Sequence, residues 1–385
     1  MQLPISITSI HSVSALGNSP EKVWQSYLAG RALFSKIKAG NEDEVWCSQI
    51  SADIESEIKA LRQKPTHRNL DRSVLLAILA SKRAFRGQQA KSSIGVNIGS
   101  SRGATALFEK YHQEFLETNR VSAYSSPTTT LGNISSWVAQ ELGVEGVSID
   151  HSVTCSTALH AVLNAMAWLN AGMATSFLAG GSEAAITPFT IAQMKSLTLY
   201  STSENELACE SMRFEKKKNS MVLGEGAAVA FLEQGNSDKT QALISGYGFA
   251  SEALTHNSAI SENAECFQKS MKMALKQANL ETVDAIVMHA PGTVKGDLAE
   301  KQAIDIVFEK LPLLTSNKWL VGHTFAASGM LNLEMAVLML AHNKFIENPF
   351  FTNARHLPKE LKTIMVNAVG FGGNAVSIII SKPNF

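Results

Sequence analysis

The 385-residue chain has few cysteines, no long apolar run and no excess of either charge. The four cysteines, Cys47, Cys155, Cys209 and Cys266, lie far apart with no C-x-x-C pair. This spacing argues against a disulfide framework or a zinc knuckle and predicts free thiols. No apolar run reaches the roughly 18 residues of a membrane span. The start, MQLPISITSI, lacks the basic segment and cleavage site of a signal peptide, so we expect a cytoplasmic protein.

The charge balance excludes partners that are recognised by net charge alone. Lys plus Arg and Asp plus Glu number 34 each, so nothing draws the whole chain to nucleic acid or to an anionic membrane surface. Hydrophobic residues make up 45% of the sequence and charged residues 18%. That composition is typical of a compact, enzyme-sized protein with a large core.

Short apolar runs alternate with longer segments of helical periodicity. The runs at 93–101, 175–184, 224–233, 284–293 and 374–381 are bounded by Gly or Ser and predict strands, whereas residues 1–90 offer little strand. The segments at 69–85, 104–117, 261–278 and 331–344 predict helices. The polar stretch 233–241 is the best candidate for a joint. It divides an α/β chain into halves at 1–236 and 237–385. Strands and glycine turns follow one another in a similar order in the two halves, which hints at duplication.

Cys155 is the strongest candidate nucleophile. It lies in VTCSTALHAV, just before a segment that we expect to form a helix. That helix would be apolar on most of its circumference and therefore buried. A thiol at a helix N-terminus gains from the helix dipole, which favours the reactive thiolate. Taken alone, such a cysteine is more often a structural core thiol.

Two histidines change that balance. His289 in AIVMHAPGT and His323 in KWLVGHTFAASG each follow an apolar run and adjoin small residues, as do sites at the carboxyl ends of strands. Together with Cys155 they supply a nucleophile and two proton-transfer groups. The turn GFGG at 370–373 brings flexible backbone whose amides can form an oxyanion hole.

Two further motifs indicate other activities. Gly99–Gly103 matches G-x-S-x-G, which makes Ser101 the nucleophile of a possible serine hydrolase with Asp297 and His323; few strands and no glycine-rich oxyanion loop precede it. The stretch 370–375 matches a dinucleotide fingerprint, but only ten residues follow it. The run KKK at 216–218 is typical of a solvated surface.

Taken together, these motifs resemble the β-ketoacyl-[acyl-carrier-protein] synthases of the elongating type. The segment ITSIHSVSALGNSPEKVWQSYLAG (7–30) resembles the family's opening strand, glycine turn and first helix. The resemblance also rests on TCSTALHA, FLAGGSEA, FEKKKNSMVLGEGAAVAFLE, HAPGTVKGDLAEKQA and KWLVGHTFAASG, in that order along nearly the whole chain. It implies a thiolase-like fold of two duplicated α/β halves in an αβαβα layering. A thiolase proper is disfavoured because no cysteine follows Cys266.

The resemblance also implies a role for each site residue. Cys155 would accept the acyl group, and His289 and His323 would promote decarboxylation of the malonyl unit. Lys318 and Glu300 would hold the histidines and nearby water in place. Phe371 would gate the pocket, and its amide, with Gly372 beside it, would join that of Cys155 in the oxyanion hole. Thr293 would contact the pantetheine arm.

This reading requires no metal and no cofactor, and it names the acyl carrier protein as partner. The chain would form a homodimer or pair with a related subunit.

Departures from the family pattern leave a second role open. Ala290-Pro291 stands where the family usually has Gly-Thr, which removes a hydroxyl expected near pantetheine. Ser220-Met221 replaces a usual Gly-Phe pair, and Val369 replaces an aromatic residue. The turn GFGGNAV lacks the threonine that normally follows the glycines. These departures favour a specialised polyketide or polyene system over housekeeping fatty-acid elongation. The alternative is a non-catalytic subunit of the chain-length-factor type.

Overall fold

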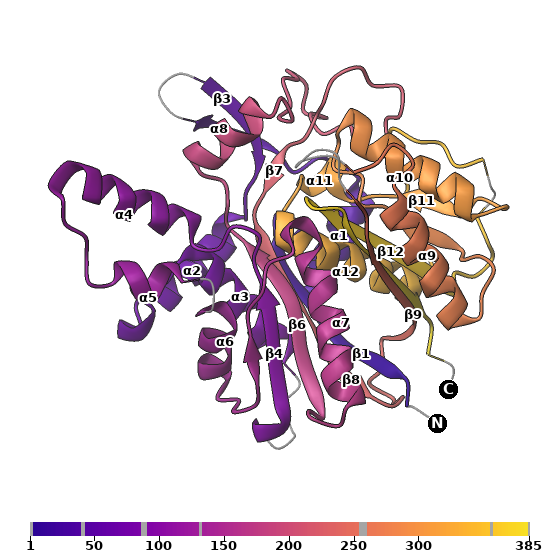
Figure 1. The fold of residues 1–385 in the computed structure, drawn as a ribbon, viewed down its shortest axis with the longest axis horizontal. Coiled ribbons are helices and arrows are strands. Elements are labelled where there is room, and N and C mark those ends of the chain that lie inside the picture. Colours follow the sequence, from indigo (N-terminus) through magenta and orange to yellow (C-terminus); the bar gives the residue numbers. More distant parts are fainter. Residues whose placement is uncertain are drawn as a thin grey trace.

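One sheet of ten strands organises the described part of the chain (Figure 1). The computed structural model describes residues 3–39, 43–85, 91–130, 133–253, 260–354 and 357–383. Within them the strand order is β11-β10-β12-β13-β9-β1-β8-β6-β4-β5. The strands are β1 (Ile5–Ser14), β4 (Ile94–Gly99), β5 (Ser148–Ile149), β6 (Ser176–Glu183), β8 (Gly226–Gln234), β9 (Ala242–Ser251), β10 (Ala285–Val287), β11 (Leu313–Thr315), β12 (Thr363–Gly370) and β13 (Asn374–Ser381).

The sheet repeats one pairing pattern in two runs of five strands. In β5-β4-β6-β8-β1, the β5/β4 and β4/β6 pairs are parallel and the β6/β8 and β8/β1 pairs are antiparallel. In β11-β10-β12-β13-β9, the same sequence of parallel and antiparallel pairs recurs. The two runs meet where β1 pairs with β9 at Ile5–Ile7. The duplication expected from the order of the sequence motifs is therefore present in the topology.

Helices cover both outer faces and fill the space between the two runs of strands. The outer helices of the first run include α3 (Arg72–Ala84) and α6 (Ile134–Leu142), and those of the second include α9 (Glu265–Ala278) and α10 (Val294–Val307). Between them lie α7 (Thr157–Asn170) and α12 (Ser328–His342). The result is the expected αβαβα layering. Along the chain, α7 comes after β5 and α12 comes after β11, so each central helix follows the edge strand of its own run.

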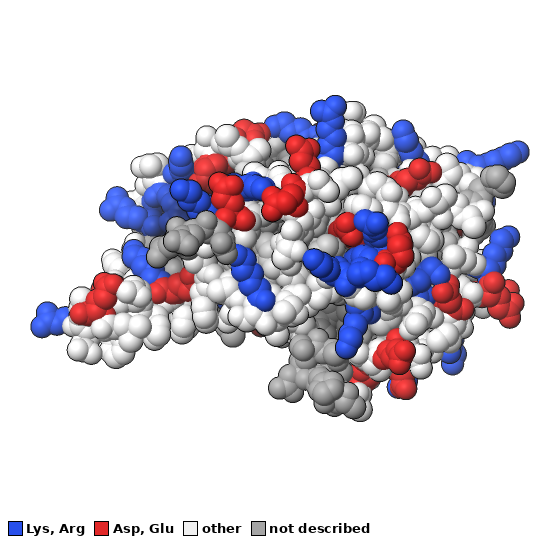
Figure 2. All heavy atoms as spheres, turned by 90° about the horizontal axis from the view of Figure 1, so that it is seen from above, with Lys and Arg blue, Asp and Glu red and all other residues white. Residues whose placement is uncertain are grey.

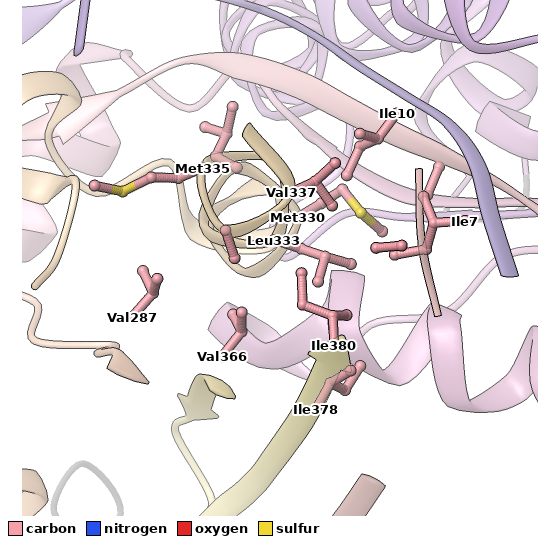
Figure 3. Packing of buried hydrophobic residues seen from close by; sticks show 14 of the residues in the cluster. Ile7, Ile10, Val287, Met330, Leu333, Met335, Val337, Val366, Ile378 and Ile380 are labelled. Carbon is pink, nitrogen blue, oxygen red and sulfur yellow. The ribbon is translucent and has the colours of Figure 1, made fainter. Parts of the chain in front are cut away.

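The central helix α12 is buried on nearly every side because both runs of strands pack against it. Figure 3 shows Met330, Leu333 and Val337 of α12 among side chains of β1 and β13, with Val287 of β10 nearby. Burying an apolar side chain of this size contributes about 1.5–3 kcal/mol. Among the described residues, Phe325–His342 is long and apolar enough to cross a membrane, yet 89% of it is buried inside the fold. That burial is typical of a core helix.

The remaining elements surround this core. A small sheet contains β2 (Ser35–Ala39), β3 (Asp43–Ser48) and β7 (Leu223–Gly224). The other helices are α1 (Pro20–Ala29), α2 (Ala52–Arg62), α4 (Thr105–Thr118), α5 (Ser125–Thr129), α8 (Pro188–Ser196) and α11 (Lys318–Val321). Figure 1 shows α4 and α5 projecting from the body of the molecule.

The predicted strands and helices are present, with one exception in the N-terminal region. The prediction of little strand before residue 90 was wrong, since β1, β2 and β3 lie there. The opening strand and first helix that the resemblance implied at 7–30 are present as β1 and α1. Strand β1 is buried along nearly all its length between β8 and β9, so its sequence lacks the alternation that marks a half-exposed strand. The joint expected at 233–241 coincides with the connection between β8 and β9.

Candidate active site

Cys155 lies in a tight 3₁₀ turn, Thr154–Ser156, that leads into the buried helix α7. Thr157 fixes the turn, because its hydroxyl accepts a hydrogen bond from the Val153 amide at 2.9 Å and donates one to the Thr154 carbonyl at 2.6 Å. Thr154 has a φ of 48°, which bends the backbone sharply just before the cysteine. The side chain of Cys155 is thereby held at the buried start of the helix, as the sequence predicted.

Gly370, at the end of β12, lies against this turn. A Cβ at that position would come within 1.9 Å of the Thr154 hydroxyl and 3.2 Å of the Cys155 amide nitrogen. The Thr154 hydroxyl also donates to the carbonyl of Phe371 at 3.4 Å. The GFGG turn is thus brought to the backbone of the candidate nucleophile, and glycine is the residue that permits this approach.

The two candidate histidines meet across one cavity with Cys155. Their rings are perpendicular, with centroids 5.3 Å apart and an interplanar angle of 84°. His289 follows β10, and His323 follows α11, where its amide donates to the Val222 carbonyl at 2.7 Å. Within the described residues, the buried Nδ1 atom of each ring has no hydrogen-bond partner. Both rings and Cys155 line the same cavity.

Glu300 and Lys318 lie behind the histidines and are fully buried. Glu300, on α10, accepts hydrogen bonds from the amides of His289 at 3.0 Å and Ala290 at 2.8 Å, and from the side chain of Asn367 at 3.2 Å. Its carboxylate therefore fixes the backbone that carries the first histidine. The Lys318 Nζ has no hydrogen-bond partner among the described residues, and Glu300 is the carboxylate with the largest influence on it.

Burial sets the protonation states of the site. It lowers the pKa of both histidines well below the usual value, with the positive charge of Lys318 acting in the same direction, so both imidazoles are neutral. Burial lowers the pKa of Lys318 to about 8 and raises that of Glu300 to about 7.

Burial opposes the thiolate character predicted for Cys155 from its place at a helix end. Burial first, and then the negative charge of Glu183, raise its pKa to about 12, although Lys318 and Arg102 act in the opposite direction. That prediction considered the helix dipole but could not include the desolvation of a buried side chain. The candidate nucleophile is therefore a neutral thiol at rest, which would have to lose its proton in order to react.

The cavity has a volume of about 1050 Å³ and a cationic lining. Four lysines line it, Lys195, Lys217, Lys218 and Lys295, and none of its described lining residues is acidic. Figure 2 shows that Lys and Arg are otherwise interspersed with Asp and Glu on the face seen from above. The positive charge at this cavity is therefore a local feature, suited to an anionic group.

The remaining predicted site residues also line the cavity. Thr293, Phe371 and Gly372 are among its walls, and the Phe371 side chain is 40% exposed. Thr293 also caps α10, because its hydroxyl accepts a hydrogen bond from the Gly296 amide at 3.2 Å. The site residues that the resemblance implied thus lie in the cavity wall or directly behind it, whereas Ser101 is not among the described residues that line the cavity.

The departures in the histidine turn are accommodated by a local hydrogen-bond network. The Ser220 hydroxyl donates to the Gly292 carbonyl at 2.8 Å and accepts from the Glu210 amide at 3.0 Å. Ala290 has a φ of 28°, a left-handed conformation that L-residues with a side chain adopt at a cost, and its carbonyl accepts from Ser211 at 2.7 Å. These hydrogen bonds hold the turn in place with alanine at position 290.

Two interpretations of charged residues need correction. Lys216 was predicted to be a solvated surface residue, but it is buried and its Nζ lies 2.6 Å from Asp297. Asp297 was the candidate acid of the serine hydrolase, yet its oxygens accept from Lys216 and from the amides of Met212 and Gly292. The sequence pattern KKK could not show that one of its three lysines points inward to a carboxylate.

Sequence reasoning missed Glu183, which lies at the end of β6 and is fully buried. Its carboxylate accepts from the Ser100 hydroxyl and from the amides of Ser101, Arg102 and Ala326 at 2.9–3.3 Å. Burial raises its pKa to about 7. A glutamate in the apolar run FLAGGSEA was the available signal. Glu183 fixes the turn that carries Ser101, so that turn is occupied by a structural contact.

Sequence comparison decides the family. The beta-ketoacyl synthase N-terminal domain matches residues 2–237, and the beta-ketoacyl synthase C-terminal domain matches residues 241–351. The chain belongs to the beta-ketoacyl synthase family. Its relatives in this family include 3-oxoacyl-[acyl-carrier-protein] synthase 2 of Coxiella burnetii, 29% identical with 98% of each chain covered, and the enzyme of the same name from Vibrio cholerae, 26% identical with the same coverage.

Solved ketosynthase structures share the fold over the whole chain. A beta-ketoacyl synthase from Burkholderia phymatum matches with a TM-score of 0.85 at 24% identity and covers 100% of both chains. The ketosynthase of a type II polyketide synthase, solved in complex with its acyl-carrier protein and bound to the hexaketide, matches with a TM-score of 0.86 at 20% identity over 100% of both chains. The thiolase-like architecture expected from the motifs is confirmed.

Proposed function

We propose that the chain catalyses the decarboxylative Claisen condensation of an acyl thioester with malonyl-[acyl-carrier-protein], in fatty-acid or polyketide biosynthesis. The observation that carries this proposal is the convergence of Cys155, His289 and His323 on one cavity, in a chain that matches both domains of the beta-ketoacyl synthase family. A thiol and two neutral imidazoles are the groups that thioester exchange and enolate stabilisation require.

In the first step the Cys155 sulfur attacks the carbonyl carbon of the acyl thioester. A bond forms between Sγ and that carbon, the carrier's C–S bond breaks, and the carrier thiol leaves with the proton that Cys155 loses. A neutral imidazole of the facing pair can carry this proton, since burial leaves both rings unprotonated. The amides of Cys155 and Phe371, with Gly372 beside them, would stabilise the tetrahedral oxyanion.

In the second step malonyl-carrier protein loses carbon dioxide. The electron pair of the breaking C–C bond forms an enolate, whose oxygen accepts hydrogen bonds from His289 and His323 as neutral donors. The enolate carbon then attacks the acyl carbonyl, so a C–C bond forms while the bond from Sγ to carbon breaks. The β-ketoacyl product leaves on the carrier, and the Cys155 thiolate takes up a proton from solvent. Glu300 and Lys318 act as positioning residues behind the pair.

The cationic cavity lining supports the acyl carrier protein as partner. The four lysines suit the phosphate of a pantetheine arm and an acidic carrier surface, and Thr293 lines the same cavity as Cys155. Complexes of structural relatives point to the same partners: one contains an acyl-carrier protein, and another, from Xenorhabdus doucetiae, pairs a ketosynthase with its chain length factor. A dimer of like or related subunits is part of the proposal.

The proposal extends to domain organisation and location. We place the two halves at 1–236 and 237–385, a division supported by the repeated strand order and by the matched domains, which adjoin at 237 and 241. We place the reaction in the cytoplasm, with which four free, buried thiols agree.

The test is condensation by the purified chain, with the acyl adduct located by peptide mass. Incubation with an acyl-carrier thioester should place the acyl group on Cys155, and addition of malonyl-carrier protein should release carbon dioxide and a β-ketoacyl product. Cys155→Ala should abolish both. His289→Asn should retain acylation and lose condensation, whereas His112→Asn, at an exposed position on α4, serves as the matched control.

Other outcomes would support the alternative roles. An absence of adduct, both alone and with a related ketosynthase subunit, would favour a non-catalytic chain-length-factor-like subunit. An adduct on Ser101 would contradict the condensing reaction and favour hydrolysis.

A further inference from the structure

Arg102 lies in the turn between β4 and α4, beside the nucleophile but outside the catalytic set. Glu183 accepts the amides of Ser101 and Arg102, and also that of Ala326 in the turn before α12. Phe325, in that same turn, packs in one apolar cluster with Cys155. The Arg102 backbone is therefore fixed relative to the acyl-accepting thiol.

The guanidinium of Arg102 retains unused hydrogen-bonding capacity. Its Nη2 donates to the side-chain carbonyl of Gln193 on α8, while its Nε is buried without a partner among the described residues. Both oxygens of Glu183 are already occupied by the four donors named above. An unpartnered buried donor on a charged group gains free energy from any acceptor that reaches it.

The position of Arg102 relative to the cavity shows which molecule could supply that acceptor. Arg102 does not line the cavity, but Met194, which follows its partner Gln193 on α8, lines it and packs in the cluster with Cys155. The positive charge of Arg102 also acts to lower the pKa of Cys155. An acyl chain that is bound to Sγ and passes Met194 toward α8 would approach the Arg102–Gln193 pair.

We propose that Arg102 is a specificity-determining residue, which selects acyl groups bearing a carbonyl oxygen near the thioester over plain alkyl groups. The inference rests on the proposed function, since it concerns the acyl group on Cys155. A chain oxygen would accept a hydrogen bond from the guanidinium. A methylene at the same place would shield the guanidinium from water without accepting a hydrogen bond from it.

The test compares two four-carbon thioesters, acetoacetyl-pantetheine and butyryl-pantetheine, which differ in chain by one keto oxygen. Acylation of Cys155 in the full-length chain forms the Sγ–C bond, breaks the pantetheine C–S bond and releases pantetheine thiol, and it is followed by peptide mass. The native chain should favour the acetoacetyl group. Arg102→Met, which keeps the length of the side chain, should lower that preference by about tenfold or more, the value of one charged hydrogen bond.

Three further variants separate selectivity from folding. Arg102→Lys keeps the charge and should retain part of the preference, and Gln193→Glu should weaken it, because a carboxylate would occupy the guanidinium. Arg120→Met, at an exposed position after α4, should leave it unchanged.

Two results would overturn the role of Arg102. If both acylation rates fall equally in Arg102→Met, or the preference is unchanged, the residue is structural only. If the native chain accepts neither thioester, nor any carrier-bound acyl group, the proposed function fails, and the role of Arg102 fails with it.

Discussion

The neutral resting state of Cys155 predicts an unusual pH profile for its alkylation. Burial and Glu183 raise the pKa of the thiol from 9.0 to about 12, a shift that corresponds to about 4 kcal/mol against the thiolate. The dipole of α7 opposes this by at most about 2 kcal/mol, or roughly 1.5 pKa units. The effect of burial on the pKa therefore exceeds that of the helix dipole. Even with the full dipole effect, fewer than about one thiol in a hundred is ionised at pH 8.

The assay is alkylation of Cys155 by iodoacetamide, measured by peptide mass between pH 6 and pH 10. Because only the thiolate reacts, the rate should rise about tenfold for each pH unit, with no plateau below about pH 10. The mass of the labelled peptide separates Cys155 from the other three cysteines.

Two variants test whether nearby charges set the pKa of Cys155, and they should change the alkylation rate in opposite directions. Lys318→Met removes a positive charge that favours the thiolate, so alkylation should slow below about pH 8, where Lys318 is charged. Glu183→Gln removes a negative charge that opposes the thiolate, so alkylation should accelerate above about pH 7, where Glu183 is ionised. Lys344→Met, at an exposed position after α12, is the matched control. A plateau at or below pH 8 in the native chain would refute the argument, since it would mean that local charges and the helix end outweigh desolvation.

Three further predictions concern stability and are measured by chemical denaturation. Ala290→Gly should stabilise the fold by about 0.5–1 kcal/mol, because it relieves a φ of 28°; a loss of stability would contradict the assigned strain. Burial raises the pKa of Glu334 to about 7, so native stability should fall by up to about 3 kcal/mol as pH rises from 4.5 to 7, and Glu334→Gln should remove that part of the slope. Lys216→Met should cost about 3–5 kcal/mol by leaving Asp297 buried and unpaired, and adding Asp297→Asn should restore part of the loss; no recovery would show that the ion pair is not the cause.

Much of the fold was predictable because its glycine-bounded runs and helical segments are local patterns. The helix that follows Cys155 is apolar on most sides, and it is indeed the central helix α7. Strand β1 was missed as a strand pattern because both its faces are buried, which removes the alternation. Local pattern also could not show that β1 joins the two runs of strands.

The site was predictable in its residue types but not in its electrostatics. Cys155, His289 and His323 could be named because each stands in a distinctive motif, and the structure places all three on one cavity. The inward turn of Lys216 and the four contacts of Glu183 depend on residues distant in sequence. Burial of the thiol likewise arises from packing against residues distant in sequence, such as Cys47, Tyr200 and Phe325, which a helix-end argument does not include.

The electrostatics of the site favour chemistry by neutral groups. Both imidazoles are neutral and the thiol is protonated, so the rings can donate hydrogen bonds to an enolate without first losing a charge. Lys318 lowers the pKa of both rings, which makes the imidazolium form less accessible still. Glu300 fixes the backbone of the first ring while it offsets the charge of Lys318. Glu300 therefore holds the backbone of His289 in place, and in the proposed reaction the two neutral rings are the donors where negative charge develops.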